Sequence, residues 1–462
     1  MTVKSDCILD VVGVGLGPFN LSTAALLDPF PEITACFFER EKEFQWHPGL
    51  LFPEATIQVS FLKDLVTLAD PTSRYSFLAF LFANRRLYRF INANFARVTR
   101  VEFNQYFRWV ANQLPSLEFG SEVKEISCND ESFIVSAGNR SVTARNIILG
   151  TGLQPMLPDC TVPHLGPTVL HASKYLMQKP NTGQKRVAVI GGGQTGAEIV
   201  CNLLSREEMR PEMLYWISRR PNFLPLDDSP FTNELFTPNY SDYFYGLSSQ
   251  DRLSILAEQK LASDGISNSL LERIYQLLYE AEFLNGQGRS CFLHPRYELT
   301  GMKSSHRNGW TLTLYNLLNG SLLPLEVDVI ILATGSVFNP LPALQPILHL
   351  FHRDGKDFVI KEDYSVGWDG PESLKVYLQN GARHCRGVAD PNLSLMAWRS
   401  ARIINSVMGR CVYDIAESAS AFEAARSPLN ERSLENDLQH FNEFSKAELF
   451  AHRSIARRHA GI

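Results

Sequence analysis

Two glycine-rich turns, each directly after a short apolar run, constrain the fold of this chain more than any other feature. The first turn, GVGLGP at residues 13–18, follows an apolar run that starts at Ile8. The second turn, GGGQTG at residues 191–196, follows the apolar run 186–190. A segment of helical composition comes after each turn. This order of strand, turn and helix predicts an α/β fold with two Rossmann-like dinucleotide-binding domains.

The residue at the end of the next strand distinguishes the two predicted sites. Glu39 stands about 20 residues after the first turn, where a carboxylate accepts hydrogen bonds from a ribose diol. The matching position after the second turn holds Ser218, followed by Arg219 and Arg220. An arginine binds a ribose 2′-phosphate that a glutamate would repel. We therefore expect FAD at the first site and NADPH at the second; the alternative is that both arginines are solvated turn residues.

The composition excludes several other classes of protein. The 462 residues hold 44 Lys and Arg against 49 Asp and Glu, which leaves no basic excess for a nucleic-acid partner. No apolar run reaches the ~18 residues of a membrane span, so no membrane partner is expected. The eight cysteines are scattered, without a Cys-x-x-Cys pair. This scatter is typical of a cytoplasmic protein with reduced thiols, and it argues against a dithiol enzyme and against a metal site.

Further apolar runs divide the chain between the two sites. Those at residues 146–149 and 329–332 also end in small-residue turns, where α/β sheets place ligands. Residues 226–285 carry helical periodicity, and a small helical insertion there would cover a substrate. The expected parts are an FAD-binding domain at 1–165 and 329–426, an NADPH-binding domain at 166–225 and 286–328, the helical insertion at 226–285, and a polar C-terminal tail at 427–462.

Two nucleotide sites without a dithiol motif restrict the chemistry. NADPH would reduce the flavin, and the flavin would then act on something other than a disulfide. Oxygen activation is favoured, with the protein keeping water away from a C4a-hydroperoxyflavin beside a nucleophile. A flavin reductase or redox sensor without oxygenase activity is the alternative from a different class.

A series of motifs along residues 7–410 resembles one enzyme family. The motifs are GVGLGPFNL at 13–21, WHPG at 46–49, QVSFLKDL at 58–65, DPTS at 70–73, GGGQTGAE at 191–198, DDSPFTNE at 227–234, ATG at 333–335 and LSLMAWR at 393–399. They resemble the siderophore-pathway N-hydroxylating flavin monooxygenases, which include lysine N6-, ornithine N5- and putrescine or cadaverine N-hydroxylases. The resemblance implies FAD and NADPH as cofactors, O2 as co-substrate, a small aliphatic amine as substrate, and a homo-oligomer, either dimer or tetramer.

The same resemblance implies roles for individual side chains. Lys63 and Asn233 would contact the substrate or the groups around it. Gln58 would lie near the flavin ring, Ser394 would line the pocket beside it, and Arg219 would bind the 2′-phosphate. Gln58, Lys63, Asn233 and Ser394 are thus the expected catalytic set. The expected cofactor-binding residues are Gly13, Gly15, Gly17, Pro18, Glu39, Trp46, His47, Gln58, Gly191, Gly193, Gln194, Thr195, Gly196, Ser218, Arg219, Thr334, Gly335 and Leu393. The alternatives are that Lys63 pairs with Asp64 and that Asn233 is a helix cap or turn residue.

The sequence departs from the motifs of two related enzyme groups, and these differences reduce the number of candidate substrates. Ketone monooxygenases carry a longer fingerprint, of which this chain keeps only its end, His171-x-x-x-Tyr175. We therefore expect His171 to orient a connection between the domains and not to act as a base. In ornithine enzymes an Asn-Tyr-Ser stretch that follows the Asn233 region binds substrate, and we interpret LASDG at 261–265 as the corresponding segment here. The first departure disfavours a ketone and the second disfavours ornithine.

The remaining candidates are a diamine and L-lysine. The second ammonium group of a diamine favours carboxylates, whereas the carboxylate of lysine favours Lys63 or an arginine. Acids and tyrosines that suit an alkyl diamine are Asp227, Asp228, Glu234, Asp242, Asp264, Tyr240, Tyr243 and Tyr245; the alternative is a solvated acidic face. We expect putrescine or cadaverine, with L-lysine as the alternative. An amine with a pKa of about 10.4 must lose its proton before it attacks oxygen, so the pocket has to desolvate it or deliver it neutral.

Overall fold

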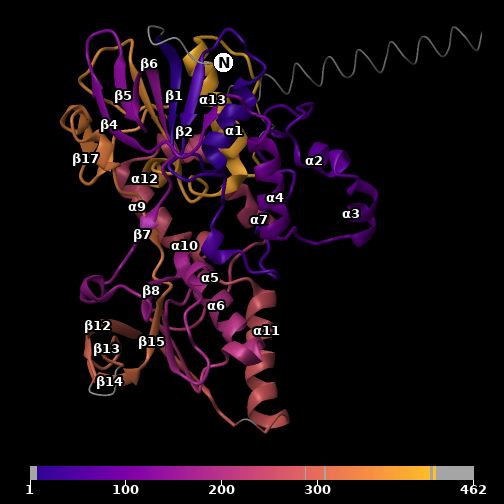
Figure 1. Cartoon of the computed structure of the whole chain (residues 1–462), viewed down its shortest axis with the longest axis vertical. Helices are drawn as coiled ribbons and strands as arrows, with labels where there is room; N and C mark the ends of the chain where they lie inside the picture. The colour runs from indigo at the N-terminus through magenta and orange to yellow at the C-terminus, as the bar shows by residue number, and fades with distance from the viewer. Residues whose placement is uncertain (1–7, 287, 306–308, 417–419, 423–462) are drawn as a thin grey trace, which may run out of the picture.

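The computed structural model describes residues 8–286, 288–305, 309–416 and 420–422. The tail expected at 427–462 lies outside these residues. Two α/β lobes follow each other along the long axis of the molecule, and each contains a sheet that carries one of the glycine turns (Figure 1). The sheet of the first lobe is mixed and that of the second is parallel. The predicted α/β class with two Rossmann-like domains is confirmed. Within the described ranges, no helix combines the length and the apolar character that crossing a bilayer requires.

The sheet of the first lobe is centred on β1, which is buried because helices and loops cover both faces of a parallel sheet. The sheet order is β3 (Leu117–Glu118), β2 (Ala35–Phe38), β1 (Leu9–Val14), β6 (Arg140–Leu149), β5 (Phe133–Ala137) and β4 (Val123–Cys128). The first half of β6 pairs antiparallel with β5. Its second half pairs parallel with β1 and with β19 (Lys375–Leu378). The carboxyl ends of β1, β6 and β19 therefore meet at the first glycine turn.

Two helices far apart in the sequence pack against each other in the first lobe, α1 (Pro18–Leu27) and α13 (Met396–Met408). The hydroxyl of Thr23 on α1 donates to that of Ser400 on α13 at 3.0 Å. Other elements of this lobe are α2 (Phe77–Ala83), α3 (Leu87–Ala93), α4 (Arg100–Ala111), α12 (Arg383–Arg386) and the hairpin of β17 (Arg353–Asp354) and β18 (Asp357–Phe358). The last quarter of the described chain thus completes a domain that the first quarter begins.

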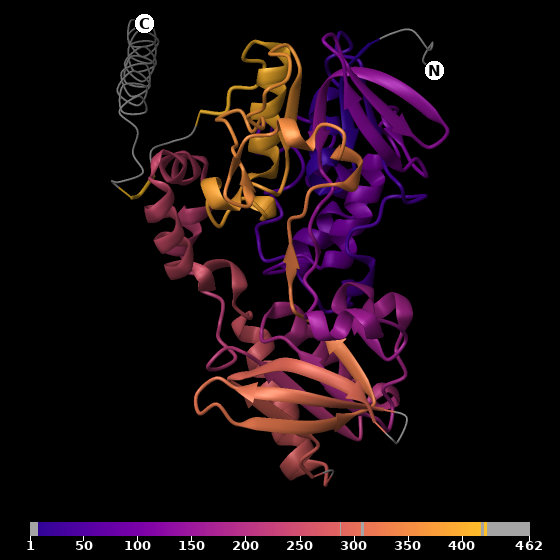
Figure 2. The ribbon, with the colours of Figure 1, turned by 90° about the vertical axis from the view of Figure 1, so that its left-hand side faces the viewer.

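The second lobe has a five-stranded parallel sheet. Its order is β11 (Cys291–Pro295), β10 (Met213–Ser218), β9 (Arg186–Ile190), β15 (Val329–Leu332) and β8 (Val169–His171). Helix α6 (Gln194–Ser205) follows the second glycine turn and packs against α11 (Asn268–Tyr279). A separate antiparallel sheet of β12 (Tyr297–Ser304), β13 (Trp310–Asn316) and β14 (Leu322–Val327) crosses the lower end of the lobe (Figure 2).

Two domain boundaries differ from the sequence expectation. Strand β15 pairs with β9 and β8, so residues 329–332 belong to the second lobe and not to the FAD-binding part that was expected to begin at 329. The chain returns to the first lobe only after β16 (Ser336–Val337), which pairs antiparallel with β7 (Gln154–Pro155) in the outgoing connection. Helix α11 connects the parallel strands β10 and β11, so it is a crossover helix of the second lobe and not part of the insertion.

The remaining helical insertion packs on the first lobe. It contains α7 (Pro230–Asn233), α8 (Pro238–Gly246), α9 (Ser249–Glu258) and α10 (Lys260–Asp264), which run along one side of the molecule (Figure 2). Phe236 and Ala262 are buried in the core of the first lobe. Conversely, Phe52 and Ala55 of the first lobe are buried in the core of the second, with the Phe52 ring 5.8 Å from that of Tyr175. The two lobes therefore interlock.

Candidate active site

The first glycine turn leaves open space at the start of α1. A Cβ at Gly13 would lie 2.0 Å from the Phe37 ring, and one at Gly15, where φ is +80°, would lie 2.8 Å from the Gly150 carbonyl oxygen. At Gly17 the nearest atom, the same carbonyl oxygen, is 3.9 Å away. Close packing thus explains the first two glycines. The third leaves room at a helix N-terminus, where a pyrophosphate fits.

Glu39, at the carboxyl end of β2, is fixed at the rim of this turn. One carboxylate oxygen accepts a hydrogen bond from the Leu16 N–H at 2.7 Å, and the other accepts one from the Glu41 N–H at 3.0 Å. Each oxygen keeps a lone pair for a further donor. The residues of this turn therefore fit the ribose and pyrophosphate of a dinucleotide with an unphosphorylated ribose.

The second turn repeats this arrangement. A Cβ at Gly191 would lie 2.0 Å from the Ala333 carbonyl oxygen, and one at Gly196 would lie 2.2 Å from the Gly191 carbonyl oxygen. A Cβ at Gly193 would find its nearest atom, the Asp264 carbonyl oxygen, only at 3.9 Å. The turn is therefore open at the same place as the first one. The end of α10, which belongs to the insertion, stands beside it.

The Ser218 and Arg219 positions fit the expected 2′-phosphate site. The Ser218 hydroxyl accepts a hydrogen bond from the Arg220 N–H at 3.1 Å, which closes the bend after β10. The Arg220 guanidinium donates to the Asp264 carbonyl at 2.6 Å. The exposed Arg219 guanidinium meets Glu298 at 3.3 Å, and exposed pairs of this kind contribute little stability. Arg219 is therefore able to leave Glu298 and bind a phosphate, whereas the Arg220 guanidinium is already bonded to the Asp264 carbonyl.

Gln58 and Lys63 lie in the connection before α2. The side-chain nitrogen of Gln58 is buried without a hydrogen-bond partner in the described structure. An orphaned donor of this kind fits an acceptor on a bound flavin ring. The Lys63 ammonium is half-buried, has no ion-pair partner among the described residues, and has its pKa lowered by burial.

Asp64 does not pair with Lys63, so the ion-pair alternative for this lysine does not hold, and the alternative of a surface lysine stays open. The Asp64 carboxylate accepts hydrogen bonds from the backbone N–H groups of Val66 at 2.9 Å, Thr67 at 2.7 Å and Phe77 at 2.6 Å. Its charge is used to hold the loop onto the start of α2. Lys63 remains a cation that a ligand can use.

Ser394 lies in the short helical turn that leads into α13. The side-chain oxygen of Asn392 accepts from both the Ser394 N–H at 2.9 Å and the Ser394 hydroxyl at 2.8 Å. The Ser394 hydroxyl proton is therefore committed, and its lone pairs are left as acceptors. Leu393 precedes it at the start of the same turn. Asn392 is a site residue that the sequence analysis missed, although an Asn two residues before a Ser at a helix start is a recognisable capping signal.

Asn233 ends the short helix α7. Ser229 caps that helix, with its hydroxyl accepting from the Thr232 N–H at 3.2 Å. Asn233 precedes the next helical turn, Glu234–Phe236, but its side chain makes no capping hydrogen bond there. The exposed Asn233 amide donates to the Asp228 carbonyl in a long contact of 3.5 Å. The role of Asn233 toward substrate stays a prediction.

The connections between the lobes carry the other expected cofactor residues. The Trp46 N–H donates to the Asn104 side chain at 3.0 Å, and its ring lies 5.4 Å from that of His47, a residue with φ of +48°. The Thr334 hydroxyl donates to the Met156 carbonyl. These bonds fix the WHPG and ATG motifs in the connections between the lobes.

His171 orients a connection, as expected. Its Nδ1 accepts from the Ser173 N–H at 3.2 Å, which leaves the proton on Nε2 to donate to the Gly335 carbonyl at 3.1 Å. Burial lowers the pKa of His171 and so favours this neutral form. Both ring nitrogens are occupied, and His171 is not placed to act as a base.

The acids that were expected to suit a diamine all have partners within the described structure. Asp228 pairs with Arg97, and Asp242 pairs with Arg386 at 2.8 Å and also with Arg402. The other acids are likewise bonded: Asp264 lies 3.8 Å from Arg383, Glu234 accepts from Ser420 and Ala421, and Asp227 accepts from Ser229. These arginines stand far away in the sequence, where local composition does not reveal them, and the role of the acids toward a diamine stays a prediction.

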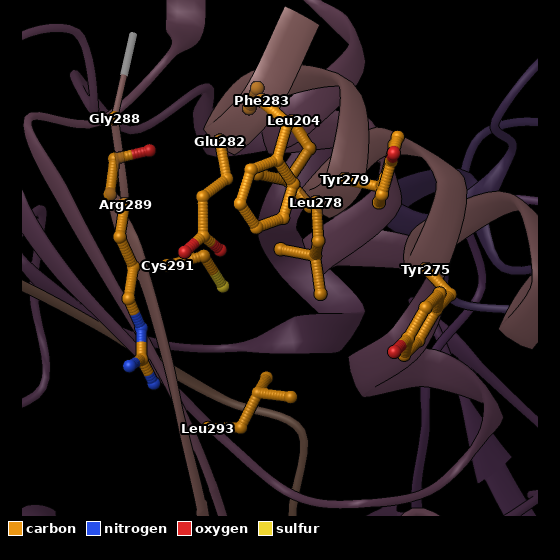
Figure 3. A pocket seen from close by; sticks show the side chains of 12 residues that line it. Leu204, Tyr275, Leu278, Tyr279, Glu282, Phe283, Gly288, Arg289, Cys291 and Leu293 are labelled. Carbon is orange, nitrogen blue, oxygen red and sulfur yellow. The ribbon is translucent and has the colours of Figure 1, made fainter.

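A cavity of about 180 Å³ lies elsewhere, between α11 and the edge strand β11 (Figure 3). Tyr275, Glu282, Arg289 and Cys291 line it with apolar neighbours. Cys291 begins β11, so the cavity lies at the opposite end of the sheet from the second glycine turn. It contains none of the expected site residues.

Two Rossmann-like lobes, an acid beside one glycine turn and an arginine beside the other define a two-dinucleotide oxidoreductase. The chain also matches, over residues 7–337, the model of the L-lysine 6-monooxygenase/L-ornithine 5-monooxygenase family. It is 40% identical over 413 residues to the L-lysine N6-monooxygenase of Escherichia coli, which covers 88% of this chain and 96% of that protein. The chain therefore belongs to this family of N-hydroxylating flavin monooxygenases.

Two solved structures resemble the fold closely. The FAD-bound cadaverine monooxygenase of the desferrioxamine pathway from Erwinia amylovora has a TM-score of 0.85 and 31% identity, over 90% of this chain and 98% of that one. The ornithine N-hydroxylase of Kutzneria sp. 744, solved with reduced FAD, NADP+ and L-ornithine, has a TM-score of 0.81 and 31% identity, over 87% and 99%. The cofactor prediction agrees with what these two proteins bind.

Proposed function

We propose that this chain uses FAD, NADPH and O2 to hydroxylate the side-chain amine of L-lysine, as a step in siderophore biosynthesis. One observation carries the choice of substrate. Lys63, in the same connection as the buried Gln58, offers a half-buried cation that has no ion-pair partner among the described residues, whereas the acids that would suit a diamine already have partners. A carboxylate-bearing substrate therefore suits the site better than the diamine that the sequence favoured. The 40% identity to a lysine N6-monooxygenase supports the same choice.

Each side chain has a defined task in this proposal. Lys63 binds the substrate carboxylate with a charge-assisted hydrogen bond, and the exposed Asn233 amide contacts the same end of the molecule. The Ser394 hydroxyl oxygen accepts a hydrogen bond from the amine, which fixes the nitrogen in its neutral form near the flavin. Gln58 donates to the flavin ring, and Glu39 holds its ribose. Bound FAD, once reduced by NADPH, supplies oxygen activation.

Desolvation deprotonates the amine in this account. An amine held away from water among the buried groups around Gln58 and Ser394 loses the hydration that stabilises its ammonium form, so its pKa falls toward neutrality. The reaction as a whole consumes the amine, O2, NADPH and a proton, and it yields the hydroxylamine, NADP+ and water. The protein residues thus have to position the amine and keep water away from it, and no strongly basic side chain is needed.

The test compares amines that differ by one group. Cadaverine is lysine without its carboxylate, and putrescine bears the same relation to ornithine. With purified FAD-loaded protein, NADPH and O2, we expect kcat/KM for hydroxylamine formation to be at least about 10-fold higher with L-lysine than with cadaverine. A preference for cadaverine would favour the diamine function, which the fold similarity to a cadaverine monooxygenase supports. NADPH consumption that yields only H2O2 with all four amines would contradict the monooxygenase proposal.

A further inference from the structure

A buried ion pair joins the two lobes. Arg100 begins α4 in the first lobe and Glu198 lies on α6 in the second (Figure 1). The two guanidinium nitrogens of Arg100 donate to the two carboxylate oxygens of Glu198 at 2.9 and 2.7 Å. Only 5% of the Glu198 side chain and 16% of the Arg100 side chain are exposed. Two parallel bonds in a buried place fix both distance and orientation.

The same carboxylate holds a residue of the second glycine turn. The Gln194 side-chain nitrogen donates to Glu198 at 2.9 Å, and the Gln194 side-chain oxygen accepts from the Ser267 N–H at 2.9 Å. Gln194 is the first residue of α6 and directly follows the open position at Gly193. Both ends of its amide are thereby fixed, and one of the two anchors is Glu198.

The other end of the pair is fixed as well. The Arg100 N–H donates to the Ala55 carbonyl at 2.8 Å, and Ala55 is buried in the core of the second lobe. The apolar contacts of Phe52 and Ala55 hold the lobes together without a preferred direction, because hydrophobic burial is non-directional. The two parallel hydrogen bonds between Arg100 and Glu198 are directional, so they fix how one lobe is oriented on the other.

We propose that Arg100 and Glu198 are positioning residues that fix the second glycine turn, through Gln194, relative to the first lobe. They set the orientation in which NADPH at the second turn reaches a flavin at the first. This inference rests on the proposed use of both cofactors. Neither residue is assigned a contact with the amine or with oxygen.

Three variants test the pair. Glu198→Gln keeps the shape of the side chain and removes its charge. Arg100→Met keeps the length of the side chain and removes the guanidinium group that makes both bonds. Removing one partner leaves a buried charge, whereas removing both in Arg100→Met/Glu198→Leu is often tolerated by the fold. The control is Arg186→Met, which breaks another two-contact pair, with Asp328 at 2.7 and 3.2 Å, that lies wholly in the second lobe.

Two measurements need neither amine nor O2: the Kd of NADP+ for the FAD-loaded protein by calorimetry, and the anaerobic rate of flavin reduction by saturating NADPH. We expect Kd to rise and the reduction rate to fall by about 10-fold in the double variant, while Arg186→Met lowers Tm and leaves both unchanged. Wild-type values in the double variant would overturn the proposal. Equal effects in Arg186→Met would also overturn it, because they would indicate general destabilisation. The Kd of NADP+ and the rate of flavin reduction test this proposal even if the protein is found not to hydroxylate an amine.

Discussion

The side-chain oxygen of Asn392 accepts two hydrogen bonds from Ser394, one from its backbone at 2.9 Å and one from its hydroxyl at 2.8 Å. This relationship caps the helical turn that leads into α13 and fixes the direction of the Ser394 lone pairs. Asn392 thus determines how a residue of the expected catalytic set presents itself, although it was not part of that set.

Replacing Asn392 by alanine should affect both stability and substrate binding. The lost cap costs about 1 kcal/mol, which lowers Tm by a few degrees, and the released Ser394 hydroxyl raises KM for the amine. Ser394→Ala is the matched control, since it keeps the backbone cap and removes only the hydroxyl. We expect it to raise KM with little change in Tm. A normal KM in both variants would exclude a role of this turn in binding the amine.

The second and third glycines of the first turn should respond differently to an added methyl group. Gly15→Ala places a Cβ at a φ of +80° and 2.8 Å from a carbonyl oxygen, so we expect a loss of about 1–3 kcal/mol in the free energy of unfolding. Gly17→Ala meets nothing closer than 3.9 Å and should keep the stability of the apoprotein. Its methyl group should instead weaken FAD binding by about 10-fold. Undiminished FAD affinity in Gly17→Ala would place the pyrophosphate elsewhere.

Arg219 should decide between NADPH and NADH. Arg219→Ala removes the partner of the 2′-phosphate, so KM for NADPH should rise by roughly 10-fold or more while KM for NADH changes little. Glu298→Gln is the control, because it releases Arg219 from an exposed pair and should not raise KM for NADPH. Steady-state NADPH and NADH oxidation measure both constants. Equal increases for the two nucleotides in Arg219→Ala would contradict the assignment.

The neutral, hydrogen-bonded ring of His171 should make the stability of the protein depend on pH. Burial lowers the pKa of His171 in the folded state, so the neutral ring stabilises the fold above the unfolded pKa of about 6.5. This contribution is lost as the pH falls through the lowered folded pKa, because the unfolded chain then binds the proton more readily. The difference in Tm between the wild type and His171→Gln should therefore be full at pH 8 and smaller at pH 5. A difference that is constant over this range would contradict the neutral, bonded ring.

Local patterns predicted the two nucleotide turns well, because everything that defines them lies within one strand, one turn and one helix. The predictions for Glu39 and Arg219 rest on the same kind of local pattern. The sheet membership of β15 was not predictable, since a short apolar run that ends in small residues looks alike in either lobe. The pairing of Asp242 with Arg386 and Arg402, and that of Arg100 with Glu198, joins residues that only the tertiary fold brings together. The partners of the acids that were expected to suit a diamine could not be read from the sequence for this reason.

The Lys63 ammonium, for which the described part of the chain offers no ion-pair partner, is the feature on which the proposed substrate depends most. The most direct measurement is the ratio of kcat/KM for L-lysine to that for cadaverine, taken in the wild type and in Lys63→Met. A charge-assisted bond to the carboxylate predicts a wild-type ratio of about 10 or more, which falls toward one in the variant because lysine loses its partner and cadaverine does not. A wild-type preference for cadaverine, or a ratio that Lys63→Met leaves unchanged, would contradict the account.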